Sequence, residues 1–216
     1  MIKLDKCKLI FLDFDGVIVD SNKFKELAIQ KSLYDVIGRT KKTEQALNYF
    51  NKYAGVSRKV KLSKFFKDSD INKILEKYEK ACKSFFQKAE PTIGFKEFIK
   101  YIKINFKKIR IFILSGGEKQ EILYFLEQNN IFYYFEDILT SNKTKQAHLK
   151  DFNVSKNDIF IGDSLSDLKA STDIDISFIL FENFKSKESF PSEELIKNHV
   201  LYRTKNFKTF LDKIII

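Results

Sequence analysis

Near its start the chain reads Leu9-Ile10-Phe11-Leu12-Asp13-Phe14-Asp15-Gly16-Val17-Ile18-Val19-Asp20. Four apolar residues run directly into two aspartates, and an apolar run without helical periodicity predicts a strand buried on both faces of a parallel sheet. Ligands of such sheets bind outside the carboxyl ends of the strands, which is where Asp13 and Asp15 fall. Alternate residues of an extended segment point the same way, so we expect both carboxylates to face one site.

These two carboxylates predict a metal site. Neighbouring carboxylates repel each other unless a positive charge neutralises them, and carboxylate oxygens suit the hard cation Mg²⁺. Gly16 permits a tight backbone turn directly after the acids. The stretch therefore predicts a Mg²⁺ site to which Asp13 and Asp15 contribute. The alternative is an ordinary surface Asp-x-Asp-Gly turn, and the apolar run that precedes the acids argues against it.

The composition is that of a globular protein, and the length is sufficient for one core domain and an insert. The 216 residues are 44% hydrophobic and 31% charged, which is typical of a soluble chain of this length. No apolar run approaches the roughly 18 to 20 residues that span a bilayer, and Asp5, Lys6 and Lys8 interrupt any secretory signal pattern. Cys7 and Cys82 lack partner motifs, so neither a disulfide nor a zinc site is indicated. We expect a cytoplasmic protein without a membrane segment, as a monomer or weak dimer.

The net charge of +10 does not identify a partner. A basic chain can bind nucleic acid, but here the lysines are scattered along predicted helices and do not form a block. Two prolines, no tryptophan and abundant lysine, isoleucine, phenylalanine and asparagine are typical of drift in an AT-rich genome. Attraction of an anionic substrate is the second interpretation, and nucleic-acid binding is the least favoured.

Outside one helical insert, predicted strands and helices alternate along the chain. Residues 20–88 carry only helical periodicity, with breaks near residues 38–40, 54–57 and 68–70. The alternation elsewhere predicts an α/β protein with a parallel sheet and helices on both faces. We expect a core domain made of residues 1–19 and 89–216, and an all-helical domain at 20–88. The expected core elements are strand 9–12, helix 95–102, strand 109–114, helix 119–128, strand 137–140, helix 144–152, strand 158–163, strand 176–180, strand 200–202 and helix 207–214.

Two further strands are expected to end on polar side chains. Ser115 follows the apolar strand 109–114, and the amides of Gly116 and Gly117 come directly after it. Asp163 ends the strand 158–163, and Asp167 is expected one helical turn further on. Since the carboxyl ends of parallel strands share one edge of the sheet, these groups are expected near Asp13.

Two lysines lie near a predicted helix start between these two strands, and the family resemblance given below implies that one of them belongs to the site. Lys143 and Lys145 flank Thr144, which is a reasonable helix N-cap. A cap at Thr144 would place Lys145 in the first helical turn, so we favour Lys145. Lys143 is the alternative, and the other lysine is then expected to be solvated.

Taken together, the four motifs resemble those of the haloacid dehalogenase superfamily. They are Asp13-Phe14-Asp15-Gly16-Val17, the strand ending at Ser115, the lysine near Thr144, and Gly162-Asp163-Ser164-Leu165-Ser166-Asp167. They occur in the superfamily's order, and the helical insert after the first motif is similar to the C1-type cap of phosphoglycolate-phosphatase-like and β-phosphoglucomutase-like members. The resemblance implies a Rossmann-like core with an inserted all-helical cap.

The resemblance also implies a reaction. Asp13 would attack phosphorus to form an aspartyl-phosphate, and Asp15 would act as general acid and then as general base. Mg²⁺ would be held by Asp13, the backbone carbonyl of Asp15, and Asp163. Asp167 would orient a metal-bound water or Lys145.

The phosphoryl oxygens would be contacted by residues from the other motifs. The resemblance assigns this role to Ser115 and Lys145, with help from the Gly116 amide and with Lys143 as the alternative lysine. The implied substrate is a small phosphorylated metabolite, such as a sugar phosphate, a glycerol-type phosphate or an amino-alcohol phosphate.

Substrate choice is expected to lie in the insert. The segment from Gly55 to Lys61 breaks two helices and carries Arg58, which could meet a second anionic or hydroxyl group of the substrate. An ordinary solvated basic turn is the alternative interpretation of the same segment.

Other activities remain as alternatives. A phosphomutase and a non-catalytic binding protein would both fit the motifs. Asp15 disfavours a dehalogenase, because halide leaves without protonation, and no single lysine of the insert stands out as the Schiff-base lysine of a phosphonate hydrolase.

Overall fold

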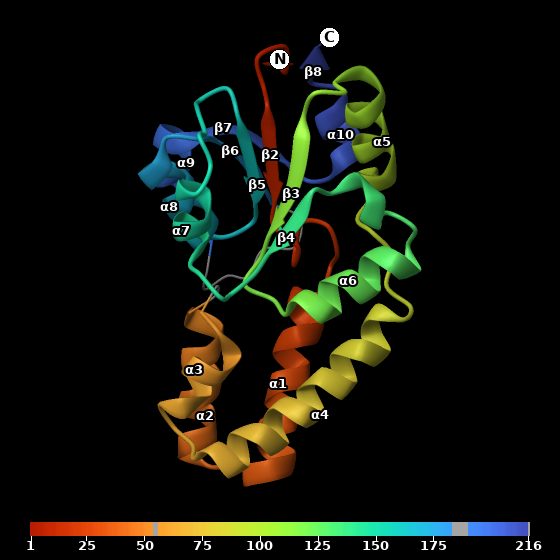
Figure 1. Cartoon of the computed structure of the whole chain (residues 1–216). Coiled ribbons are helices and arrows are strands. Elements are labelled where there is room, and N and C mark those ends of the chain that lie inside the picture. Colours follow the sequence, from red (N-terminus) through yellow and green to blue (C-terminus); the bar gives the residue numbers. More distant parts are fainter. Residues whose placement is uncertain (54–55, 183–189, 216) are drawn as a thin grey trace.

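A six-stranded parallel sheet forms the centre of the molecule (Figure 1). The computed structural model describes residues 1–53, 56–182 and 190–215. The strand order is β4-β3-β2-β5-β6-β7, with every neighbouring pair parallel, so the predicted α/β class is confirmed. The strands are β2 (Leu9–Leu12), β3 (Arg110–Leu114), β4 (Asp137–Leu139), β5 (Ile159–Gly162), β6 (Ser177–Phe181) and β7 (Val200–Thr204).

The apolar strands are continuous because both faces of the sheet are covered. Successive side chains of a strand point to opposite faces, and all four residues of β2 are buried. Ile10 and Leu12 belong to one apolar cluster, whereas Leu9 and Phe11 belong to another. The first cluster includes residues of α5 (Phe95–Asn105), α6 (Lys119–Gln128) and α10 (Phe207–Leu211). The second includes residues of α7 (Lys145–Lys150), α8 (Leu165–Ile174) and α9 (Glu193–His199).

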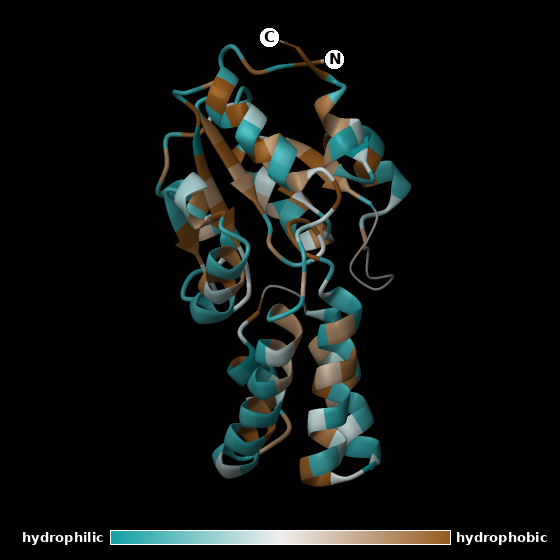
Figure 2. Ribbon diagram, turned by 90° about the vertical axis from the view of Figure 1, so that its right-hand side faces the viewer, coloured by the Kyte–Doolittle hydropathy of each residue, from teal (hydrophilic) through white to brown (hydrophobic). Residues whose placement is uncertain are grey.

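A group of four helices lies beyond the carboxyl ends of the strands (Figure 1). Its members are α1 (Asn22–Ile37), α2 (Lys41–Lys52), α3 (Arg58–Ser63) and α4 (Asp68–Phe86). The helices α1, α2 and α4 each bury a mainly apolar face. In Figure 2 the helices of this group alternate between brown and teal, whereas the strands are mostly brown.

The break expected near residues 38–40 is confirmed, since Gly38 ends α1 and Thr40 caps α2. The break expected near residues 68–70 lies earlier in the chain, because α3 ends at Ser63 and α4 already begins at Asp68. Of the break expected near residues 54–57, residues 54 and 55 lie outside the described residues. Whether residues 20–88 behave as a separate domain stays a prediction.

Three features of the chain differ from expectation. The predicted helix 207–214 ends at Leu211, and Ile214–Ile215 instead form strand β8, which pairs with β1 (Ile2–Lys3). The helix α9 was not predicted, because its seven residues bury only Ile196 and so carry too little periodicity. A short 3₁₀ turn at Phe132–Tyr134 was also missed. Two-residue strands and single turns are shorter than any pattern window can resolve.

Candidate active site

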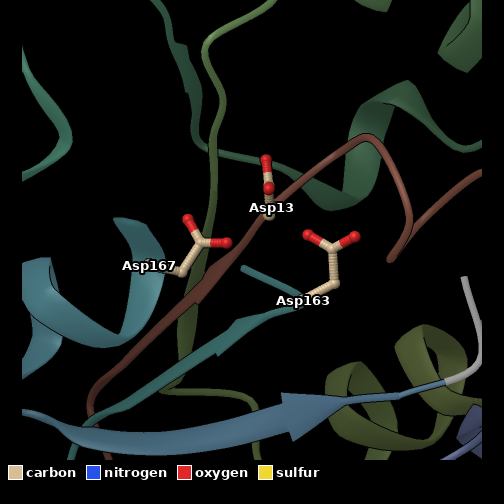
Figure 3. A group of neighbouring side chains, drawn as sticks. All are labelled: Asp13, Asp163 and Asp167. Carbon is tan, nitrogen blue, oxygen red and sulfur yellow. The ribbon is translucent and has the colours of Figure 1, made fainter. Parts of the chain in front are cut away.

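Three buried carboxylates meet at the carboxyl ends of β2 and β5. Asp13 follows β2, Asp163 follows β5, and Asp167 lies in the first turn of α8. One oxygen of each lies within 4.8 Å of the others, and Figure 3 shows the three side chains pointing toward a common space. The structure therefore brings together three of the four acids that the sequence placed at the metal site.

Two glycines allow the backbone and these acids to approach so closely. Gly16 has a φ of +77°, and a Cβ atom there would lie 2.1 Å from Asp163 Oδ2. Gly162 precedes Asp163, and a Cβ atom there would lie 2.5 Å from Asp167 Cβ. Both distances are far below van der Waals contact, so any side chain at either position would displace a carboxylate of the cluster.

Lys145 is the cation of this cluster. Thr144 is the N-cap of α7 and accepts a hydrogen bond from the Ala147 amide, as predicted. This start of the helix places Lys145 Nζ 2.9 Å from Asp13 Oδ2 and 2.5 Å from Asp167 Oδ1. Burial acts to lower the pKa of Lys145, but Asp13 and Asp167 outweigh it and raise the pKa above its usual range.

Lys143, the alternative lysine, lies outside the cluster. Its ammonium group pairs with Asp151 at 2.7 Å, and both side chains are about half exposed. Such a pair contributes little to stability. Of the two candidates, only Lys145 is placed to contact a group bound at Asp13.

The cluster carries more negative than positive charge. Three carboxylates face one ammonium group, which leaves two negative charges when all are ionised. Burial raises the pKa of Asp13 to about 7, although Lys145 opposes the effect, and burial together with Asp13 raises the pKa of Asp163 well above its usual range. A divalent cation would neutralise the two excess negative charges, and an all-oxygen donor set suits Mg²⁺. The residues present therefore fit a magnesium ion.

The carboxylate of Asp15 does not belong to this group of three acids. Lys25 Nζ of α1 lies 2.5 Å from Asp15 Oδ1, and the Ser21 hydroxyl donates a hydrogen bond to the same oxygen. Burial would raise the pKa of Asp15, but Lys25 and Ser21 outweigh it and hold the pKa below its usual value. The side chain of Asp15 was expected to face the metal site, but it is not among the three carboxylates that meet there, and its Oδ1 is engaged by Lys25 and Ser21.

Phe14 anchors the loop between the two aspartates. Its ring packs on Phe125 of α6 at 5.3 Å and on Phe86 of α4 at 5.7 Å between ring centroids. Its amide donates a hydrogen bond of 2.7 Å to Asp13 Oδ1. The loop is thus held from both the core and the helical group, which limits the freedom of Asp13 and Asp15.

Ser115 lies close to the acids at the end of β3. The side chain is buried, and its Oγ accepts a hydrogen bond from the Gly117 amide at 3.0 Å. A Cβ atom on Gly117 would lie 3.2 Å from Ser115 Oγ and 3.6 Å from Asp15 Oδ2. Ser115 and the amides of Gly116 and Gly117 therefore border the same region as Asp15.

Arg58 is buried, so the alternative of a solvated basic turn is wrong for it. It begins α3 after the N-cap Ser57, and its guanidinium donates to both carboxylate oxygens of Glu121 in α6 at 2.7 Å each. Lys61, one turn on, is also buried. The turn is covered because α3 packs on α2 and α4 and because Arg58 reaches Glu121 of α6. Gly55, the first residue of the predicted loop, lies outside the described residues.

The pattern of a known family covers most of the chain. The model of the haloacid dehalogenase-like hydrolases matches residues 9–181. The chain belongs to this family. It is therefore a hydrolase by family, and the motifs quoted above lie within the matched segment.

Solved structures share the fold of this hydrolase over nearly the whole chain. A hydrolase from Pseudomonas syringae has a TM-score of 0.72 at 16% identity, covering 96% of this chain and 97% of its own. A predicted phosphoglycolate phosphatase from Haemophilus somnus has a TM-score of 0.70 at 14% identity, covering 95% and 97%. A predicted phosphatase from Clostridium acetobutylicum has a TM-score of 0.69 at 17% identity, covering 96% and 97%. No curated protein matches the chain.

The motifs of the hydrolase do not include every residue around its site. Ser21 and Asn22 lie outside these motifs, yet the Ser21 hydroxyl donates a hydrogen bond to Asp15 Oδ1 and the Asn22 side-chain amide donates one of 2.7 Å to Asp163 Oδ2. Lys25 and Glu121 had no signal in the sequence, because their contacts depend on how α1 and α6 pack. Within the described residues, no helix is long and apolar enough to cross a bilayer.

Proposed function

We propose that this hydrolase is a Mg²⁺-dependent phosphatase that acts on a small phosphorylated metabolite through an aspartyl-phosphate. The observation that carries the proposal is the placement of Lys145 Nζ 2.9 Å from Asp13 Oδ2, inside a cluster with two more carboxylates. A carboxylate nucleophile can approach an anionic phosphate only where positive charge is concentrated. Two structural neighbours are described as predicted phosphatases, and a third, CbbY from Rhodobacter sphaeroides, was solved with phosphate.

The magnesium ion would be held by the carboxylates of Asp13 and Asp163 and by the backbone carbonyl of Asp15. Bound there, it would supply positive charge to the phosphoryl oxygens. Asp167 is already engaged, because Lys145 bonds Oδ1 and the Ser164 amide and hydroxyl bond Oδ2. Its role would be to fix Lys145, with any contact to the metal made through water.

Asp13 would act as the nucleophile. Its Oδ1 is fixed by the Phe14 amide, and its Oδ2 faces Lys145. Attack on phosphorus forms the bond from the carboxylate oxygen to phosphorus and breaks the bond to the ester oxygen. Lys145 and the Ser115 hydroxyl would hold the phosphoryl oxygens during this step.

Asp15 would move the protons of both steps. It gives its proton to the departing ester oxygen, and then takes a proton from the water that attacks the aspartyl-phosphate, which restores its starting state. Lys25 favours the ionised form of Asp15. The first step therefore requires Lys25 to move away from Asp15, and Glu121 Oε2, 3.8 Å from Lys25 Nζ, is the nearby acceptor.

The helical group would act as a cap over this site. Arg58 of α3 and Glu121 of α6 are paired with both side chains largely buried, which joins the group to the core next to Asp15. Closing a site in this way excludes water from the reaction. We propose that residues 20–88 form this cap and that the core consists of residues 1–19 and 89–216.

The test is phosphate release from a panel of small phosphomonoesters with Mg²⁺, using the wild type and Asp13→Asn. The proposal predicts release by the wild type that is lost in EDTA and lost in Asp13→Asn. Loss of substrate without release of phosphate would instead indicate a phosphomutase. Full activity of Asp13→Asn would exclude the mechanism.

A further inference from the structure

Lys61 is a buried cation that the reaction proposed above does not use. Only 6% of its surface is exposed. Its Nζ donates a hydrogen bond of 3.2 Å to the Phe50 carbonyl and lies 3.6 Å from the centroid of the Phe50 ring. These contacts offer partial negative charge but no counter-ion. Burying an ammonium group without a counter-ion is costly.

The cations near Lys61 are neutralised, and Lys61 is not. Arg58, one turn earlier on α3, is paired with Glu121, and Lys25 is paired with Asp15. Among the described residues, no carboxylate oxygen lies within 4.0 Å of Lys61 Nζ. Burial, and then repulsion from Arg58 and Lys25, lower the pKa of Lys61 to about 7. The repulsion from Lys25 means that Lys61 lies within electrostatic range of Lys25, which itself contacts Asp15.

We propose that Lys61 binds a second anionic group of the substrate, a carboxylate or a second phosphate, on the leaving-group side of the site. This inference rests on the proposed phosphatase function and narrows its substrate class to phosphomonoesters with a second negative charge. The helix α3 lies at the end of the helical group nearest the sheet (Figure 1). A group held by Lys61 would therefore belong to the part of the substrate that extends from the phosphate toward the cap.

Lys61 is a better candidate for this contact than Arg58. The two hydrogen bonds from Arg58 to Glu121 are bidentate and charge-assisted, which is the strongest form of such a pair. The positive charge of Arg58 is therefore already neutralised by Glu121, which weakens its attraction for a further anion. Lys61 would gain a counter-ion without losing one, so the same anion would stabilise both the complex and the fold around α3.

The experiment compares substrates that differ only in the second anion. 3-Phosphoglycerate is paired with glycerol 3-phosphate, and fructose 1,6-bisphosphate with fructose 6-phosphate, so that the two pairs separate a carboxylate from a second phosphate. We expect the wild type to prefer one of the anionic members in kcat/KM. In Lys61→Met that preference should fall by about 10- to 100-fold, as expected for loss of a hydrogen bond between charged groups, and mainly through KM.

Two controls separate a binding role from a structural one. Lys59→Met removes an exposed lysine of the same helix and should leave the preference unchanged. Lys61→Arg keeps the positive charge and should retain most of the preference for the anionic substrate. An unchanged preference in Lys61→Met, or no preference in the wild type, would overturn the inference while leaving phosphatase activity intact.

A binding measurement tests the role of Lys61 separately from the proposed phosphatase activity. In Asp13→Asn, calorimetry should give a lower Kd for the preferred anionic compound than for its neutral partner, and adding Lys61→Met should remove the difference. A difference in Kd without any release of phosphate would contradict the proposed phosphatase function and would still support the role of Lys61. Equal Kd values in Asp13→Asn with and without Lys61→Met would contradict the role of Lys61.

Discussion

The ammonium group of Lys145 lies 2.9 Å from Oδ2 of Asp13. Both side chains are about nine-tenths buried, and they come from α7 and from the end of β2. A contact between groups 132 residues apart exists only because β2 and β5 are neighbours in the sheet and α7 precedes β5. The topology of the sheet thus assembles the nucleophile and its cation.

Replacing this lysine should abolish activity. Lys145→Met leaves Asp13, Asp163 and Asp167 without their ammonium group, so we expect kcat to fall by about 100-fold or more, the effect of removing a positioned charge from a transition state. Lys143→Met is the matched control, since its ammonium pairs with Asp151 at the surface. Steady-state phosphate release measures both. Equal losses in the two variants would contradict the assignment of Lys145.

Magnesium should stabilise the fold through Asp163. A ligand that binds only the native state adds about 2.7 kcal/mol to the free energy of unfolding at a concentration 100 times its Kd. We expect Mg²⁺ to raise the Tm of the wild type and to have little effect on Asp163→Asn, which loses one charge of the cluster. Differential scanning calorimetry with Mg²⁺ or EDTA provides the comparison. A Mg²⁺-induced rise in Asp163→Asn as large as that of the wild type would place the ion elsewhere.

Gly16→Ala should damage the site more than the fold. The positive φ of Gly16 costs an alanine about 1–2 kcal/mol, and its Cβ would meet Asp163 Oδ2 and Asn22 Nδ2. We expect a modest fall in Tm together with a large loss of the Mg²⁺-induced rise in Tm. Gly38→Ala is the control, because Gly38 also has a positive φ, but a Cβ atom there would have no neighbour within 4 Å. The same response to Mg²⁺ in both variants would show that only backbone strain matters.

The Arg58–Glu121 pair should be strongly coupled. Removing one partner of a buried ion pair leaves an uncompensated charge and costs roughly 3–5 kcal/mol, whereas removing both costs much less. We expect this pattern in urea unfolding of Arg58→Met, Glu121→Met and the double variant. The surface pair Lys143–Asp151 serves as the control, with a coupling below about 1 kcal/mol. Additive effects for Arg58 and Glu121 would show that the pair does not join α3 to α6.

Lys61→Met should stabilise the protein in a pH-dependent way. The folded-state pKa of Lys61, about 7, lies below its unfolded value of 10.5. Between these values the unfolded chain binds more protons, so wild-type stability rises with pH, and the full cost of the buried charge is present below pH 7. We expect the free energy of unfolding of Lys61→Met to exceed that of the wild type by up to a few kcal/mol near pH 6–7. This difference should shrink toward pH 10, and urea unfolding at a series of pH values measures it. A pH-independent difference would show that Lys61 is not a destabilising cation.

The sequence predicted the part of the site that lies on strand ends and helix starts. Asp13, Asp163 and Lys145 are positioned by a buried strand, another buried strand and the N-cap Thr144, and each of these is a local pattern. The same reasoning predicted both lysines as candidates, and only the N-cap favoured the one that the structure brings to Asp13.

The rest of the site depends on packing between distant elements. Lys25 reaches Asp15 because α1 begins shortly after the loop that follows β2. Glu121 reaches Arg58 because α4 packs on both α3 and α6. No spacing in the chain encodes these contacts. For the same reason a solvated turn stayed open as an alternative for Arg58, since burial of a short basic helix cannot be read from its own residues.

The central claim is a phosphoryl group carried by Asp13, and intact-protein mass spectrometry of Asp15→Asn tests it directly. p-Nitrophenyl phosphate is the substrate, because p-nitrophenolate leaves without protonation, whereas breakdown of the intermediate needs Asp15 as base. After an acid quench, the account predicts the added mass of one phosphoryl group, located on the peptide that contains Asp13. Release of p-nitrophenolate with unmodified protein, or with the phosphoryl group on another residue, would contradict it.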